Sequence, residues 1–224
     1  MYNDGALTGI IVVAQVCPSQ NCVIATATYG SPLAPEVQVL RGFRDQQLMK
    51  TYAGSNFMIL FNAWYYSWSP PVARYENTNQ PMRTVMMGAL YPLIGIMSAA
   101  SVAFSVLSPL SPEFAAVTVG IMASPLIGFF YLGLPLALVR IRIRRLAGLK
   151  KQRLLNSTLS TCLLGGLVML VVGEAFASSL ATMLAGATIV LSTTLLAATM
   201  TSAVVANRFT LHFSNPFESK KPRT

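Results

Sequence analysis

Two long stretches of this chain contain no charged residue, and they constrain its fold more than any other feature. Residues 84–107 and 114–139 both lack Asp, Glu, Lys and Arg. At about 1.5 Å per residue, each is long enough to cross a hydrocarbon core of about 30 Å as a helix. The connection SPLSPE between them predicts a short turn at one membrane surface.

Residues 155–206 form a second apolar region, in which Glu174 is the one charged residue. Because this region is far longer than one crossing needs, we expect a hairpin of two helices. We expect its turn at 173–179, with 183–187 as the alternative. Its many small residues predict close helix packing. The sequence therefore predicts an all-α integral membrane protein with about four transmembrane helices.

Charge supports this class and indicates an orientation. Only 10% of the residues are charged, whereas soluble domains carry about 25%. The net charge of +9 is concentrated in two blocks, at 140–153 and 208–224. Basic blocks beside apolar spans favour the cytoplasmic side, so we expect a multi-pass protein of the cell membrane and no nucleic-acid partner. With four spans, the segment before residue 84 is also expected in the cytoplasm.

The same reasoning divides the chain into five regions. Residues 1–83 form an N-terminal region, 84–139 a first transmembrane hairpin, 140–153 a basic cytoplasmic loop, 154–207 a second hairpin and 208–224 a basic cytoplasmic tail. Residues 51–73 are uncharged, and their apolar core FMILFNAWYYSW is short and aromatic. We expect an interfacial helix there, ended by Ser69-Pro70-Pro71, with a full membrane span as the alternative.

Few residues could carry chemistry. The one histidine, His212, cannot build an imidazole metal centre alone. Cys17 and Cys22 are spaced for a disulfide or thiol pair, or for half of a metal site, while Cys162 is expected to be a packing residue. Glu174 is either an intramembrane polar site or a solvated turn residue. No cofactor is expected.

The basic loop has two interpretations. It is a topology signal alone, or it also contacts anionic lipid headgroups, to which each Lys or Arg adds about 1 kcal/mol. The candidate headgroup contacts are Arg140, Arg142, Arg144, Arg145, Lys150 and Lys151.

Residues 22–36 read CVIATATYGSPLAPE. Ser31-Pro32 and Ala34-Pro35-Glu36 are typical of a helix start, so a helix is expected to about Lys50. Its apolar arc would comprise Leu33, Val37, Leu40, Phe43 and Leu48. These local signals do not explain the preceding IATATYG.

This segment resembles the CFI-box, whose usual form is CFIATAAYGSPLAPEV followed by R-x-F-R-D and an aromatic segment ending in S-P-P. The matching residues are Cys22, Ile24–Ala27, Tyr29–Val37, Arg41, Phe43–Asp45 and YYSWSPPVA at 65–73. Val23 and Thr28 depart from the usual form. The multi-span version resembles membrane proteins of ammonia-oxidising archaea.

The resemblance implies a non-catalytic accessory or structural subunit, with other integral membrane subunits and membrane lipids as its partners. An archaeal ammonia monooxygenase-type assembly is the most specific candidate complex. The alternative is a thiol-redox or metal-handling membrane protein that acts through Cys17 and Cys22. A transporter would need more polar groups along its spans than the sequence offers.

Overall fold

The computed structural model describes residues 22–142 and 149–214. Every regular element in these residues is helical, which confirms the all-α class. Four helices are long and apolar enough to cross a membrane: Gln80–Leu107, Pro112–Arg142, Gln152–Ala175 and Ser179–Ala206. The two uncharged stretches and the long apolar region therefore form the helices that the sequence predicts.

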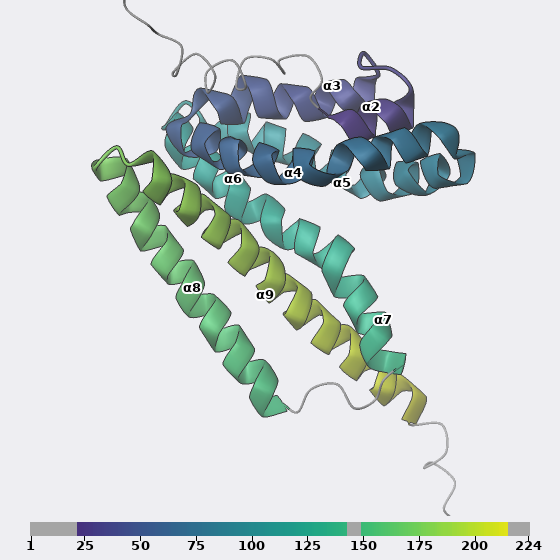
Figure 1. Cartoon of the computed structure of the whole chain (residues 1–224). Coiled ribbons are helices and arrows are strands. Elements are labelled where there is room, and N and C mark those ends of the chain that lie inside the picture. The colour runs from purple at the N-terminus through teal and green to yellow at the C-terminus, as the bar shows by residue number, and fades with distance from the viewer. Residues whose placement is uncertain (1–21, 143–148, 215–224) are drawn as a thin grey trace, which may run out of the picture.

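The helices form an N-terminal layer and a stem (Figure 1). The layer contains α2 (Val23–Tyr29), α3 (Pro35–Arg41), the π-helical η1 (Gly42–Gln47), the 3-10 turn η2 (Leu48–Lys50), α4 (Tyr52–Thr78) and α5 (Gln80–Leu107). The stem contains α6 (Pro112–Ile127), the π-helical η3 (Gly128–Gly133), α7 (Leu134–Arg142), α8 (Leu149–Ala175) and α9 (Ser179–Ser214). The layer lies across one end of the stem.

Small residues hold the stem together, as their abundance predicts. A Cβ on Gly128 would collide with the backbone carbonyl of Thr194, so α9 and the α6–η3 junction touch through their backbones. A Cβ on Gly166 would lie 3.1 Å from the side chain of Ile189. Such close approach is how helices associate where lipid provides no hydrophobic driving force.

The turn between α8 and α9 lies at 176–178, within the first of the two expected ranges. Ala177 adopts a positive φ of 48° there, and Ser178 N donates to the carbonyl of Gly173 at 2.8 Å. The structure thus confirms that residues 155–206 fold back as a hairpin.

The helices on either side of Ser108–Ser111 share a buried core near their connection. Phe104 and Ala100 of α5 are buried against Ala115 and Val119 of α6, and Phe43 of η1 completes this core. Beyond it, α5 stays in the layer while α6 enters the stem (Figure 1). The pair at 84–139 is therefore a hairpin whose arms diverge, although the Tyr131 hydroxyl of η3 still donates to the backbone oxygen of Ala89 in α5.

The expected end of the aromatic helix at Ser69-Pro70-Pro71 is wrong, because α4 runs through both prolines to Thr78. Proline removes a backbone donor and would normally break a helix. Here the helix is fixed by packing on both sides of the prolines: Ser69 before them, and Ala73 and Glu76 after them, are all buried. Tertiary contacts on this face outweigh the local preference.

The helix expected from Pro35 to Lys50 is present but irregular. It passes from α3 through the π-helical η1 to the 3-10 turn η2. Val37 and Phe43 are buried as expected, whereas Leu33 precedes the helix and is 78% exposed. The predicted apolar arc is thus wrong at Leu33.

Candidate functional site

Helix α2, the IATATY segment, is buried in the layer because its side chains are small. Ile24, Ala25, Ala27 and Thr28 are all less than 10% exposed. With such residues the backbone of α2 can lie close to α4 and α5, at the packing density of a protein interior. We call the residues that fix it there, Thr28, Tyr65, Glu76 and Arg83, the Thr28 cluster.

A buried hydrogen bond joins α2 to α4 at the centre of this cluster. The Thr28 hydroxyl donates to Oε1 of Glu76 at 2.5 Å and lies 2.9 Å from the carbonyl oxygen of Ile24. Thr28 is 0% exposed and Glu76 1% exposed. The second carboxyl oxygen of Glu76 is buried and has no hydrogen-bond partner among the residues that the structure describes. The Thr28 hydroxyl therefore satisfies one of the two carboxyl oxygens of Glu76.

The carbonyl end of α2 is held by α5. Arg83 Nε donates to the backbone oxygen of Thr28 at 2.6 Å, where a cation also suits the negative end of a helix. Gly30 closes the helix at φ +74°, and a Cβ there would lie 2.9 Å from an Arg83 guanidinium nitrogen. The positive φ favours glycine at this position.

The amino end of α2 is held by α4. The Ile24 N–H, which has no partner within a helix, donates to the hydroxyl oxygen of Tyr65 at 3.2 Å. Burial raises the pKa of this phenol. Side chains from α4 and α5 thus satisfy both ends of a helix that is too short to be stable alone.

Cys22 precedes α2 in a left-handed conformation, with φ 78°. Its thiol is half-buried and free, whereas Cys17 lies outside the described residues. Burial raises the pKa of the Cys22 thiol, although the Arg44 and Arg41 guanidinium groups oppose this shift. The thiol is therefore in its protonated, less nucleophilic form at neutral pH.

A second group of polar residues lies where α4, α6 and the α8–α9 turn meet. Glu113 accepts hydrogen bonds from the backbone N–H groups of Tyr52 at 2.5 Å and Ala53 at 3.0 Å. These groups have no partner within α4, so Glu113 caps that helix. A cavity of about 250 Å³ opens between Tyr52, Glu113, Glu174 and Ala177.

Glu174 is exposed near the end of α8, beside the turn. It shares the small cavity with Glu113, but it lies at the end of its span, where a turn residue would lie. Cys162 is exposed on α8, so it does not pack against another helix among the described residues, and its expected role as a packing residue stays a prediction.

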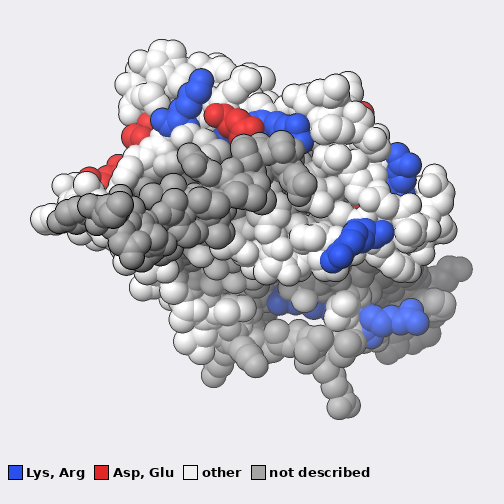
Figure 2. Space-filling model, turned by 45° about the horizontal axis from the view of Figure 1, so that its top comes forward, with Lys and Arg blue, Asp and Glu red and all other residues white. Residues whose placement is uncertain are grey.

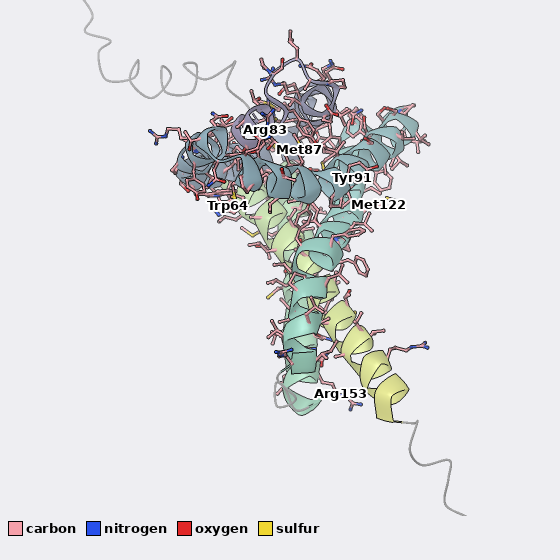
Figure 3. The ribbon with its side chains drawn as sticks, turned by 90° about the vertical axis from the view of Figure 1, so that its right-hand side faces the viewer. Trp64, Arg83, Met87, Tyr91, Met122 and Arg153 are labelled. Carbon is pink, nitrogen blue, oxygen red and sulfur yellow. The ribbon has the colours of Figure 1, made fainter. Side chains whose placement is uncertain are left out.

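Four of the candidate headgroup residues, Arg140, Arg142, Lys150 and Lys151, belong to the helix ends at the far end of the stem. Arg140 and Arg142 belong to the last turns of α7, and Arg142 is exposed. Arg144 and Arg145 lie outside the described residues, while Lys150 and Lys151 belong to the first turn of α8. Arg153, the next basic residue, lies at the opposite end of the stem from the layer (Figure 3).

Within residues 22–142 and 149–214, no three His, Cys, Asp or Glu side chains lie close enough together to hold a metal ion. Comparisons with protein-family models, curated proteins and solved structures each found no match. Among the described residues, the candidate site is therefore the Thr28 cluster, a set of buried polar contacts that join α2 to α4 and α5.

Proposed function

We propose that this chain is a non-catalytic accessory or structural subunit of a larger membrane protein complex. The observation that carries the proposal is the outward face of α8. Within the described residues α8 packs mainly against α9. Its opposite face is exposed and carries Ser157, Thr161 and Gly165 at intervals of four residues, which places them on one stripe.

Small polar residues add no packing or hydrogen-bond stability to a helix face that contacts only lipid. Small side chains let a second helix approach closely, and hydroxyl groups can bond across such an interface. A Cβ on Gly165 would meet no atom of this chain, so its own packing does not require the glycine. We therefore assign the stripe to a transmembrane helix of a partner subunit.

The likeness of residues 22–37 to the CFI-box supports a more specific version of the proposal. In this version the chain is archaeal, lies in the cell membrane and belongs to an ammonia monooxygenase-type assembly. The Thr28 cluster would then keep the layer in one conformation. The alternative thiol-redox function is less well supported, because the raised pKa of Cys22 disfavours a reactive thiolate.

Extraction in a mild detergent, native-gel separation and mass spectrometry test the proposal. The wild-type chain should migrate in a large assembly with other integral membrane proteins. Gly165→Leu should lower the comigrating fraction about tenfold, equivalent to ~1.4 kcal/mol, while leaving the chain itself folded.

Gly166→Leu is the matched comparison, because that side chain would meet Ile189 inside the chain. It should lower the thermal stability of the purified chain, which Gly165→Leu should not. Migration of the wild-type chain alone, or only with copies of itself, would refute the accessory function.

A further inference from the structure

The polar segment that follows α2 runs beside α5 over most of the length of that helix. At one end, Arg83 of α5 bonds to the carbonyl oxygen of Thr28. At the other end, Gln47 Nε2 donates to the Ser101 hydroxyl at 2.7 Å. The distance along α5 from Arg83 to Ser101 is about 27 Å at 1.5 Å per residue, nearly the thickness of a hydrocarbon core.

This flanking segment is charged and partly exposed. It contains Glu36, Arg41, Arg44 and Asp45, and the Asp45 side chain is 46% exposed although it pairs with Arg44 at 2.6 Å. Gln38 and Gln46 are exposed as well. Figure 2 shows basic and acidic side chains over the top of the molecule.

These charges decide where α5 can lie. If α5 crossed the bilayer, the flanking charges would lie at the same depth. A charged residue at the depth of the hydrocarbon core is costly, and although Arg44 pairs with Asp45, the segment would still bring Glu36 and the exposed Asp45 side chain to that depth. The apolarity of α5 itself does not remove this cost, because the two segments are packed together.

The stem shows on which side of the membrane the layer lies. The N-terminus of α4 is bonded to Glu113, at the first turn of α6. Arg153 lies at the other end of the stem, far from Arg83, Met87 and Tyr91 in the layer (Figure 3). The layer and the basic loop are thus at opposite ends of the stem helices.

We infer that α5 does not cross the membrane, and that the layer of α2–α5 lies at the membrane surface opposite the basic loop. Three crossings remain: α6 with α7, α8, and α9. With the basic loop in the cytoplasm, the layer is extracytoplasmic, and so is Cys22. This arrangement differs from the four-span topology, which puts residues before 84 on the cytoplasmic side.

The layer would contact the lipid interface through the exposed aromatic side chains of α4 and α5. Trp64 is 58% exposed, Trp68 36%, Tyr75 57% and Tyr91 79%. Tryptophan and tyrosine are the residues enriched at headgroup depth, where one part of the ring is apolar and another is wet. The partner of this surface is therefore the headgroup region of the bilayer.

The native lysines provide a test of sidedness. Sealed right-side-out and inverted vesicles are treated with a membrane-impermeant amine reagent, and labelled peptides are identified by mass spectrometry. Lys50 should be labelled from the side opposite to Lys150 and Lys151. In an Asn77→Lys variant, at an exposed position near the α4–α5 connection, the new lysine should be labelled together with Lys50.

Two results would overturn the inference. Labelling of Lys50 from the same side as Lys150 and Lys151 would establish the four-span arrangement. Labelling of Asn77→Lys with Lys150 and Lys151, but of Lys50 from the other side, would show that α4 and α5 both cross the bilayer.

Intrinsic fluorescence tests the depth of the layer without a substitution, because Trp64 and Trp68 are the two tryptophans of the chain and lie in the middle of α4. The chain is placed in vesicles of phosphatidylcholine with brominated acyl chains. Bromine atoms near the headgroup should quench this fluorescence more than bromine atoms near the ends of the acyl chains. The reverse order would place α4 across the bilayer and overturn the inference.

Discussion

Thr28→Val removes the hydroxyl at the centre of the Thr28 cluster and nearly preserves the shape of the side chain. The bond to Glu76 is then lost, and that carboxyl group, 1% exposed, keeps no partner among the described residues. Leaving a buried hydrogen-bond partner unsatisfied costs ~1–3 kcal/mol, and a charged group lies toward the upper end of this range. We expect the free energy that holds α2 in the layer to fall by about 2–3 kcal/mol.

Amide hydrogen exchange measures this directly, because it reports the local opening of α2 separately from the rest of the chain. A loss of 2–3 kcal/mol should lower protection of the α2 amides about 30- to 150-fold. Exchange in α8 should stay unchanged. Thr28→Ser keeps the hydroxyl and serves as the control.

The double variant Thr28→Val with Glu76→Met separates the bond from general packing. Removing both partners of a buried hydrogen bond can be nearly neutral, so the double variant should recover much of the protection lost in Thr28→Val. Unchanged protection in Thr28→Val would refute the claim that the Thr28–Glu76 hydrogen bond holds α2 in the layer. If the double variant loses at least as much protection as the two single variants lose together, packing alone holds α2.

Three further predictions concern the ends of helices. Gly30→Ala should destabilise the detergent-solubilised chain by ~1–3 kcal/mol in thermal unfolding, because its φ is +74° and Arg83 is close, whereas Gly88→Ala in open space should not. Glu113→Ala should remove the cap of α4 and lower stability to SDS unfolding by ~1–2 kcal/mol, unlike Glu174→Ala. Alkylation of Cys22, followed by mass spectrometry of its peptide, should have its midpoint above the usual thiol pKa, since burial favours the protonated form; a lower midpoint would contradict this.

The stem helices could be predicted from the sequence because their signals are local. The length of a charge-free run shows whether it can span the bilayer, the connection at 108–111 contains serine and proline, and the turn at 176–178 follows from an apolar region too long for one crossing. Gly166 and Gly128 belong to the abundance of small residues that predicts close packing. Each of these features is contained within a few turns of chain.

The Thr28 cluster could not be predicted because its partners are far apart in the sequence. Thr28 is 48 residues from Glu76 and 55 from Arg83. The signal that could have found it is indirect: Glu76 and Arg83 border long stretches that are otherwise apolar or uncharged, and charges that become buried there need partners. Most residues of the IATATYG segment have small side chains, because α2 must fit between α4 and α5.

The two prolines of α4 show how tertiary contacts override a local signal. Pro70 and Pro71 predict a helix end, yet the buried contacts of Ala73 and Glu76 continue the helix. The surface position that we infer for α5 could not be predicted for a similar reason. Its own composition predicts a crossing, while the charges that argue against one lie on a different segment.

Photo-crosslinking in intact membranes tests the accessory function most directly, with the reactive group placed at Thr161 on the outward face of α8. The proposed function predicts a discrete adduct with a different integral membrane protein, identified by mass spectrometry. Adducts with lipid alone, or only with a second copy of this chain, would contradict it.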